Sequence, residues 1–496
     1  MLPTTGRTGP ERASGAPSGS SKVTETSASA AVGVDETFQH FAEGAGIPGL
    51  AWGVVAEGRL VHQGGSGLAD RTGGRAVAAD TAFRIASMTK SLTAVCILTL
   101  RDRGLLQLDD PLERHLPEAA ALSAGGEDDS PITVRHLLTM TAGFVEDDPW
   151  ADRQLALPDR ELLRILQGGV ALTRRPGEAF EYSNLGYALL GQVAKQVSGE
   201  PLAELAREVL LQPLGMRDSV FDFTSLPAGR RARGYRRDGT EYWEEPPLAD
   251  GAFGAMGGLW TTVEDFARYV GFQLSAWKPE EAPPPLLRAS SRREMQRGHI
   301  VVPPRDHPAP GGGPSGYGLG LFVAESPELG RVVYHGGGLP GYGSHVQWLP
   351  RLGIGVFAFS NLTYASLSGP VFEALERVAR AVPVAAPERT AEWSWLQARV
   401  TALYQAEDSE GWAELAADNL LLDSPAARRT AELHDLRQRL GPALEVAPPV
   451  ARGRLRATWR VRCERGEMEV ECWLAPPLPL RVQVLRFRAV EPQERA

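Results

Sequence analysis

The chain has 496 residues, of which 43% are hydrophobic, and a formal net charge of −9 with a sequence pI near 5.6. This size predicts a large core and roughly two or three domains. The acidic balance excludes a nucleic-acid partner, and we interpret the densest basic group, at 230–237, as a solvated loop. Three cysteines, Cys96, Cys463 and Cys472, are too few for a disulfide framework and predict reduced thiols.

The N-terminal segment, residues 1–33, is rich in Gly, Ser, Thr, Ala and Pro and lacks the apolar region of a signal peptide. We expect a disordered tail there and a cytoplasmic protein. No apolar stretch of the chain is long enough to predict a membrane span. Two apolar runs follow at 49–56 and 59–63, and the glycine turn that joins them predicts a hairpin.

Helical periodicity dominates residues 105–274, and clustered Pro and Gly mark a loop or insertion at 279–316. Short apolar runs with strand character return at 317–360, and a helix is predicted at 369–382. Strands at both ends with helices between them predict one sheet interrupted by a helical insertion. We therefore expect a first folded domain of mixed α/β (α+β) class over residues 34–383.

A new pattern begins after this domain. Helical periodicity at 393–440 is followed by alternating, strand-like runs at 443–490. A Pro- and Ala-rich linker precedes the first of these helices. The sequence therefore predicts a separate C-terminal α+β domain over residues 384–496.

The first candidate site is a serine followed three residues later by a lysine, Ser87 and Lys90. On a helix these side chains share one face, so the amine can reach the hydroxyl and, if partly desolvated, take its proton. Arginine could not do so because it stays protonated, and only four of the 52 basic residues are lysines. The same spacing recurs at Ser275 and Lys278 beside prolines. Spacing alone therefore leaves open a helix-capping serine and a solvated lysine.

The tripeptide Tyr182-Ser183-Asn184 is the second candidate. A neighbouring lysine can lower the pKa of a tyrosine phenol, which can then relay protons between nucleophile and leaving group. The Asn184 amide offers both a donor and an acceptor, which suits it to hold an amide group of a substrate. The alternative interpretation is an ordinary turn.

The third candidate is His335-Gly336-Gly337-Gly338, which follows a strand-like run. Small residues on an edge strand allow close approach of a substrate backbone or acyl group. The backbone N–H of Gly338, with that of Ser87, would form an oxyanion hole. The alternatives are a flexible glycine turn and a surface histidine.

These three clusters stand in the order of the three motifs of the penicillin-recognising serine hydrolases, and they resemble the class C β-lactamase-like branch of that family. The resemblance covers roughly residues 34–382. It implies an antiparallel sheet flanked by helices with an all-helical insertion. The surrounding segments that carry the same resemblance are 132–144, 182–202, 213–216 and 257–269.

The resemblance also implies roles for the candidate residues. Ser87 would be the acylated nucleophile and Lys90 its base partner. Tyr182 would relay protons, and Asn184 would hold the substrate amide. His335 stands where the lactamases usually have a lysine, so the fixed positive charge that pairs with a substrate carboxylate is missing.

The expected function is therefore a serine hydrolase that acts through an acyl-enzyme on a peptide or amide, including one with a D-amino acid, or on an ester. The missing charge argues against efficient β-lactam hydrolysis. An acyltransferase with the same acyl-enzyme and a catalytically silent binding or scaffold protein stay as alternatives. No metal or organic cofactor is expected, because nine histidines are scattered without metal-binding spacing. The oligomeric state stays open.

The C-terminal domain is similar in pattern to the helix-plus-curved-sheet domains of the nuclear-transport-factor-like superfamily. Nothing in it resembles a nucleophile–base pair, so we expect an accessory or oligomerisation module without chemistry. Within it, a two-residue turn at Arg465-Gly466 would place Cys463 opposite Met468 and keep the two sulfur atoms of the domain apart.

Overall fold

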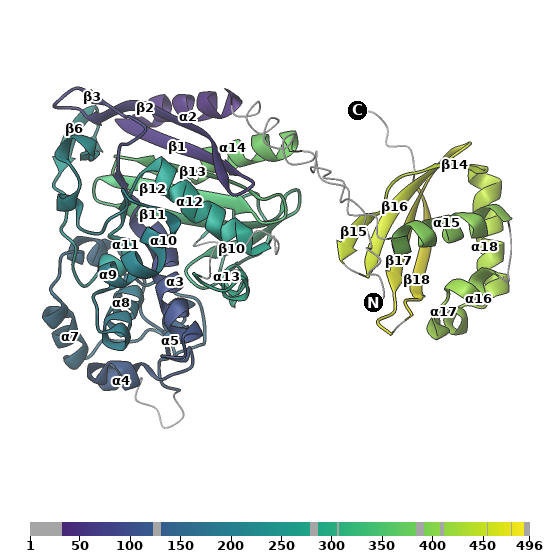
Figure 1. Cartoon of the computed structure of the whole chain (residues 1–496), viewed down its shortest axis with the longest axis horizontal. Coiled ribbons are helices and arrows are strands. Elements are labelled where there is room, and N and C mark those ends of the chain that lie inside the picture. The colour runs from purple at the N-terminus through teal and green to yellow at the C-terminus, as the bar shows by residue number, and fades with distance from the viewer. Residues whose placement is uncertain are drawn as a thin grey trace, which may run out of the picture. The chain divides into compact units, whose positions relative to one another are not determined.

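The computed structural model forms two compact units, Met1–Pro383 and Val384–Ala496, which are described separately (Figure 1). Residues 1–31 of the expected tail, Lys278 and the following Pro-rich residues 279–285 lie outside the described part of the chain. The structure describes residues 32–122, 130–277, 286–304, 307–382, 391–406, 411–453, 455–477 and 479–490.

A nine-stranded antiparallel sheet forms the centre of unit 1, in the order β3-β2-β1-β13-β12-β11-β10-β9-β8. β1 pairs with β13 from Leu50 opposite Ser360 to Ala56 opposite Ile354, so the two ends of the unit share one sheet, as predicted. The strands are β1 (Gly49–Ala56), β2 (Arg59–Asp70), β3 (Arg75–Ala76), β8 (Ile300–Val301), β9 (Ser315–Tyr317), β10 (Phe322–Ser326), β11 (Gly330–Leu339), β12 (Tyr342–Leu349) and β13 (Ile354–Ser360).

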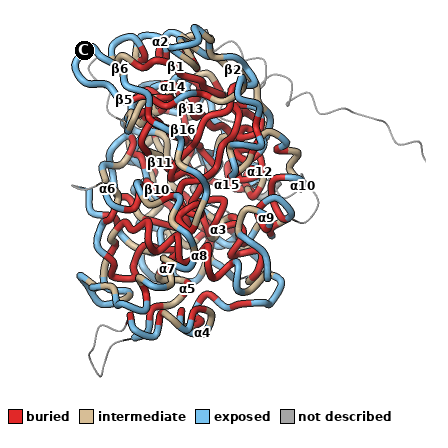
Figure 2. The backbone as a smooth tube through the Cα atoms, turned by 90° about the vertical axis from the view of Figure 1, so that its left-hand side faces the viewer, coloured by how far each residue is buried: buried red, intermediate tan, exposed pale blue. Residues whose placement is uncertain are grey.

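Helices cover both faces of this sheet, because alternate strand residues point to opposite sides. On β1, Val54 belongs to the cluster packed under α2 (Val32–Ala45) and α14 (Ser368–Ala381). The next residue, Val55, belongs to the main core with α3 (Thr89–Asp102) and α12 (Val263–Leu274). Figure 2 shows buried backbone concentrated along the strands and α3. The predicted fold class is confirmed.

The insertion between β2 and β8 is mainly helical, and α8 is its buried centre. A small antiparallel pair, β4 (Phe83–Arg84) with β7 (Trp260–Thr261), brings the start of α3 beside the start of α12. The helices of the insertion are α4 (Leu112–His115), α5 (Val134–Leu138), α6 (Asp148–Ala151), α7 (Asp159–Gln167), α8 (Asn184–Ser198), α9 (Leu202–Ala206), α10 (Gln212–Leu214), α11 (Gly254–Gly257) and α13 (Ala289–Met295).

The interpretation of the arginine-rich segment 230–237 as a loop was wrong for its second half. Residues within it form β5 (Gly234–Asp238), which pairs with β6 (Glu241–Glu245) in a hairpin. Arg236 lies opposite Trp243 and over its ring, at 5.8 Å from the centroid. The strand's outer positions are charged, so its sequence lacks the apolar alternation that predicts strands.

Unit 2 packs helices against a second antiparallel sheet in the order β14-β16-β17-β18, with β15 also pairing to β16. Its own core includes Trp412, Leu433, Trp459 and Val470. The elements are α15 (Ala391–Ala406), α16 (Gly411–Leu415), α17 (Asp418–Asp423), α18 (Ala426–Leu440), β14 (Ala443–Val446), β15 (Val450–Gly453), β16 (Arg456–Cys463), β17 (Gly466–Leu474) and β18 (Val482–Val490).

The predicted register of the β16–β17 hairpin was wrong. Cys463 pairs with Gly466, and Met468 pairs with Val461, because the turn lies one residue earlier than predicted. This shift moves the pairing by two residues, so every side chain keeps its predicted face. Cys463 is free and buried, as are the chain's other two cysteines.

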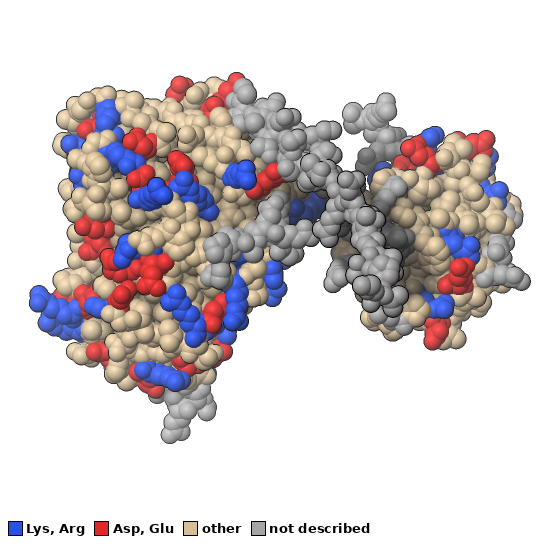
Figure 3. Space-filling view, in the orientation of Figure 1, with Lys and Arg blue, Asp and Glu red and all other residues tan. Residues whose placement is uncertain are grey.

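The described helices include none that is long and apolar enough to cross a bilayer. On the face shown in Figure 3, blue and red side chains are interspersed on each unit. This mixture agrees with the absence of a basic stripe in the sequence.

Candidate active site

Ser87 lies in a short 3₁₀ turn, Ala86–Met88, between β4 and the first turn of α3. Ala86 has a φ of 49°, in the left-handed region that residues with a side chain rarely adopt. Backbone strain of this kind clusters at functional sites, where neighbouring contacts hold it. Here Ser344 on β12 donates its hydroxyl hydrogen to the Ile85 carbonyl oxygen at 2.7 Å, which anchors the turn.

Lys90 makes the central contacts of the site. Its Nζ lies 2.9 Å from Ser87 Oγ, 2.6 Å from Asn184 Oδ1 and 3.1 Å from the Met256 carbonyl oxygen. The side chain is completely buried. A neutral amine has two N–H groups and one lone pair, so Asn184 and Met256 can take the hydrogens while the lone pair faces the Ser87 hydroxyl. The structure thus brings together the pair predicted by spacing.

Burial lowers the pKa of Lys90 to about 8, because the ammonium loses its water. Three nearby carboxylates, Asp148, Asp152 and Asp147, oppose this effect and raise the pKa. As a net result, a substantial fraction of the Lys90 side chain is neutral close to physiological pH. A group that titrates there can serve as a general base.

Removing one of these carboxylates should shift the pH dependence of activity. In wild type, kcat/KM is expected to fall as pH drops below about 8, because Lys90 becomes protonated. Asp148→Asn removes a negative charge that favours the ammonium, so the midpoint of this acid limb should move down by about half a pH unit or more. Ester hydrolysis measured across pH tests this. Asp238→Asn, in the β5–β6 hairpin, is the control and should leave the midpoint unchanged.

Tyr182 is buried with its ring beside the amine, at 4.9 Å from Lys90 Nζ to the ring centroid. Its phenol also hydrogen-bonds with Ser87. The prediction that its pKa is lowered was wrong: burial, reinforced by the charge of Asp148, raises the pKa well above its usual range. Tyr182 therefore stays protonated at neutral pH. It can donate its proton to a leaving group only if a neighbouring group supplies a replacement proton.

Asn184 opens α8 and is completely buried. Its Oδ1 accepts from Lys90, and its Nδ2 donates to Asp148 Oδ1 at 2.5 Å. Asp147 accepts the backbone N–H groups of Asn184 at 2.6 Å and of Leu185 at 2.9 Å, which fixes the start of the helix. The amide expected to hold substrate thus has both its ends engaged by the protein, and it orients Lys90.

His335 lies on β11 and is only 1% exposed, so the alternative of a surface histidine was wrong. Its Nδ1 lies 2.6 Å from the Gly336 carbonyl oxygen, which can only accept, so Nδ1 carries the hydrogen. Nε2 then accepts from the Tyr317 hydroxyl at 3.3 Å. Burial lowers the pKa of His335 to about 3, and the ring is neutral at physiological pH.

The three glycines after His335 lie where β11 passes the Ser87 turn. β10 pairs with β11 only as far as Tyr334, so no strand of the described residues lies beside the edge of β11 beyond it. A Cβ on Gly337 would lie 2.4 Å from the Ile85 carbonyl oxygen, and one on Gly338 would lie 2.8 Å from the Tyr364 ring. At position 337 only glycine permits this close approach between the strand and the Ser87 turn.

The sequence interpretation missed the acidic side of the site. Asp147, Asp148 and Asp152 surround the Lys90 and Asn184 pair, and the Tyr364 hydroxyl donates to Asp152 Oδ2 at 2.8 Å. Burial raises the pKa of Asp152 to about 7. In sequence, these acids resemble an ordinary solvated charge run. Among the described residues, no group of three His, Cys, Asp or Glu side chains could hold a metal ion.

Comparison with known proteins identifies the family. Residues 34–379 match the sequence profile of the family described as Beta-lactamase. The chain belongs to the β-lactamase family. Esterase EstB of Burkholderia gladioli is 30% identical to it over an alignment of 391 residues that covers 70% of this chain and 94% of that protein. Protein flp of Staphylococcus aureus (strain MW2) is 26% identical, over 66% of this chain and 62% of that protein.

Solved structures of the same fold extend this result. An octameric penicillin-binding protein homologue from Pyrococcus abyssi has a TM-score of 0.60 at 21% identity, covering 92% of this chain and 99% of that one. EstCE1, a hydrolase with promiscuous acyltransferase activity, has a TM-score of 0.59 at 24% identity, covering 71% and 99%. Together with the family match and EstB, they identify this β-lactamase-family chain as a serine hydrolase.

Proposed function

We propose that this β-lactamase-family hydrolase is an esterase that forms an acyl-enzyme on Ser87. The observation that carries the proposal is the buried Lys90 amine, 2.9 Å from Ser87 Oγ, with a pKa lowered to about 8. A serine hydroxyl becomes an effective nucleophile when such a base is in hydrogen-bonding contact. Ser275, the other serine of a Ser-x-x-Lys spacing, donates to the Phe272 carbonyl oxygen instead.

The catalytic cycle uses three side chains. Neutral Lys90 takes the Ser87 proton as Oγ attacks the ester carbonyl carbon. Tyr182 gives its proton to the departing alkoxide and regains one from the Lys90 ammonium. Water then attacks the acyl-enzyme, its proton passes to Lys90, and the carboxylic acid leaves as Ser87 Oγ recovers a proton. Each proton is returned at the end of the cycle.

The developing oxyanion would be held by backbone N–H groups of Ser87 and Gly338. Support comes from the edge of β11 beyond Tyr334, which borders the Ser87 turn with no strand between them in the part of the chain that the structure describes. The close approach of Gly337 to the Ile85 carbonyl oxygen brings this edge next to the nucleophile. Fixed backbone donors of this kind stabilise the tetrahedral intermediate.

The proposed substrate is an uncharged ester. His335 is neutral and buried, so it supplies no positive charge for a substrate carboxylate. The Asn184 amide is engaged by Lys90 and Asp148, which weakens the case for a peptide or amide substrate held by that residue. The relative with 30% identity is named an esterase.

Labelling and substrate comparison test this proposal. Trypsin cleaves after Arg84 and Lys90, so a fluorophosphonate adduct should appear on peptide 85–90 and fragment to Ser87 instead of Thr89. p-Nitrophenyl butyrate should be hydrolysed with a kcat/KM about 100-fold above that of nitrocefin, which carries a carboxylate, because a charge-assisted bond to that group is missing. An adduct elsewhere contradicts the nucleophile, and equal turnover of both substrates contradicts the ester preference.

Acyl transfer to an alcohol stays an alternative fate of the same acyl-enzyme. Adding butanol to the butyrate assay distinguishes the two, because a transferase forms butyl butyrate while a hydrolase forms butyrate.

We also propose the cytoplasm as the compartment, with support from three free, buried cysteines. Cell fractionation tests that assignment.

A further inference from the structure

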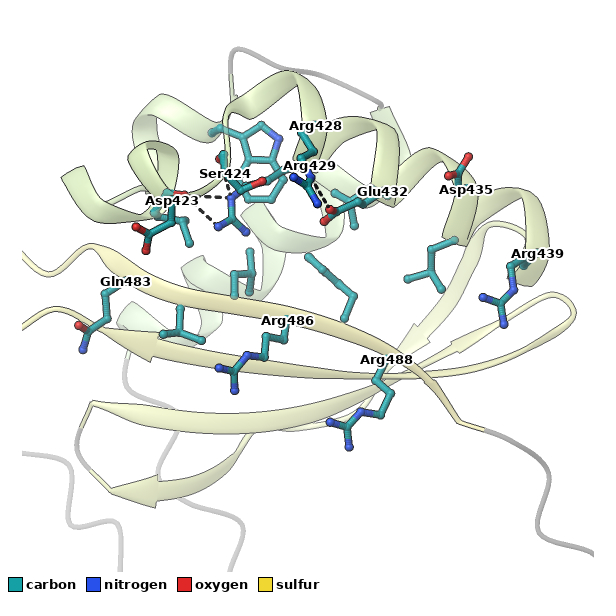
Figure 4. A pocket seen from close by; sticks show the side chains of 17 residues that line it. Asp423, Ser424, Arg428, Arg429, Glu432, Asp435, Arg439, Gln483, Arg486 and Arg488 are labelled. Carbon is teal, nitrogen blue, oxygen red and sulfur yellow. Dashed lines mark hydrogen bonds and ion pairs between the residues drawn. The ribbon is translucent and has the colours of Figure 1, made fainter.

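Unit 2 contains a groove of about 750 Å³ between its helices and the last strand of its sheet. We call it the α18–β18 groove. Figure 4 shows α18 running above β18, with apolar side chains between them and arginines along the rim. A volume of this size fits a small ligand or a short peptide segment. It is lined by Trp412, Leu420, Asp423, Ser424, Arg428, Arg429, Glu432, Leu433, Asp435, Leu436, Arg439, Gln483, Val484, Leu485, Arg486, Phe487 and Arg488.

The strand that borders this groove is the free edge of the sheet. β18 pairs with β17 on one side, and no described strand lies on its other side. Among the described residues, only the start of β18 is bonded on that side: the Ala417 backbone N–H donates to the Val482 carbonyl oxygen, and the Asn419 side-chain amide donates to the Gln483 carbonyl oxygen. Along residues 484–490 the outer backbone groups have no partner within the described part of the chain. Such a row of N–H and C=O groups is a template for another strand.

The register of β18 sorts its side chains into two rows. Leu485 and Phe487 lie opposite Cys472 and Val470, which belong to the core, so they face the helices. Arg486 and Arg488 lie opposite Glu471 and Glu469, on the outer face of the sheet. Figure 4 shows both arginines pointing away from α18. A strand added beside β18 would therefore meet an apolar surface with one row of its side chains and arginines with the other.

The charged side chains that line the groove indicate which kind of partner it binds. Five arginines and three acidic residues line the groove. Arg428 is paired with Glu432, and Arg486 is paired with Glu471. Arg439 and Arg488 are exposed and have no ion-pair partner among the residues that the structure describes. A second copy of the chain pairing antiparallel at this edge, with Phe487 opposite Phe487, would set Arg486 against Arg488 and repel.

We propose that the α18–β18 groove binds an extended peptide segment of alternating apolar and acidic residues, which adds to β18 as a further antiparallel or parallel strand. Main-chain hydrogen bonds to the β18 edge supply affinity, the apolar residues lie under α18, and the acidic residues pair with Arg486 and Arg488. This gives unit 2, expected from its sequence to be an accessory or oligomerisation module without chemistry, a partner-binding role.

Binding to the full-length chain tests the charge requirement. A fluorescein-labelled peptide of about seven residues, alternating Glu and Val, should bind with a Kd of about 1–100 μM by fluorescence polarisation. The same peptide with Lys in place of Glu should not bind. The double variant Arg486→Gln with Arg488→Gln should weaken binding about tenfold. The matched control is Arg462→Gln. Arg462 is an exposed arginine on β16 that pairs with Glu445 on β14, away from β18, and its variant should bind the peptide normally.

Backbone methylation tests the added strand. Alternate N–H groups of an edge-bound peptide point to β18, so N-methylation of one alternate set should abolish binding and methylation of the other set should not. Equal binding of both methylated peptides would overturn strand addition. The proposal is also overturned if the Glu peptide fails to bind, or if the arginine double variant binds this peptide as well as wild type does. In either case the role left for the arginines is to keep other strands from pairing with this edge. Far-ultraviolet circular dichroism checks that the variants are folded.

Discussion

Ser87→Ala is expected to reduce kcat/KM for p-nitrophenyl butyrate on the order of 10⁴-fold or more, because no acyl-enzyme can form. The fold should survive the change. The Ser87 side chain caps no helix, and Lys90 keeps its bonds to Asn184 and the Met256 carbonyl oxygen. Loss of the Ser87 hydrogen bonds to Lys90 and Tyr182 should cost only about 2 kcal/mol of unfolding free energy. Steady-state kinetics and a thermal melt measure the two effects.

The matched control is Ser275→Ala, which removes the serine of the second Ser-x-x-Lys spacing. Its hydroxyl donates to the Phe272 carbonyl oxygen and accepts from Arg292, so it serves structure. Its turnover should stay close to wild type. A Ser87→Ala variant with activity within tenfold of wild type would show that another residue is the nucleophile.

Lys90→Arg is expected to lower kcat by about 10³-fold although the positive charge is kept, because general-base catalysis needs a group that gives up its proton. Lys90 loses its proton readily since burial lowers its pKa to about 8. An arginine at this position would stay charged over the whole accessible pH range. The acid limb near pH 8 should therefore disappear from whatever activity is left, which a pH–rate profile will show.

A larger side chain in a fully buried position can also disturb packing, so two further variants accompany this one. Lys90→Met keeps the length of the chain without the amine and should be equally inactive. Lys195→Arg, at an exposed lysine that pairs with Asp159 on the same unit, should leave activity unchanged. If Lys90→Arg turns over within tenfold of wild type, Lys90 is only an electrostatic partner and not the base.

The balance of charge around Lys90 explains why both variants should act so strongly. The amine is held by Asn184, whose own amide is held by Asp148, and Asp147 fixes the start of α8. The same carboxylates that position the amine also favour its charged form. Burial outweighs them and keeps the pKa below its usual value. The site therefore depends on exclusion of water more than on any single neighbour.

Much of unit 1 was determined by local sequence. The hairpin at 49–63, the strands that follow residue 316 and the helix after Ser87 carry strong apolar periodicity, so their existence could be predicted. The β5–β6 hairpin could not, because arginines occupy its exposed positions. In unit 2, alternation fixed which faces of Cys463 and Met468 are buried, while the position of the turn decided their partners.

The sequence by itself determined the candidate residues: three clusters in family order, with Ser87 and Lys90 one helical turn apart. Only the tertiary structure decided how they behave. Burial lowered the pKa of Lys90 and raised that of Tyr182, and the buried environment of His335 removed its charge. Desolvation and long-range contact depend on what the rest of the chain places around a side chain, and no local pattern encodes them.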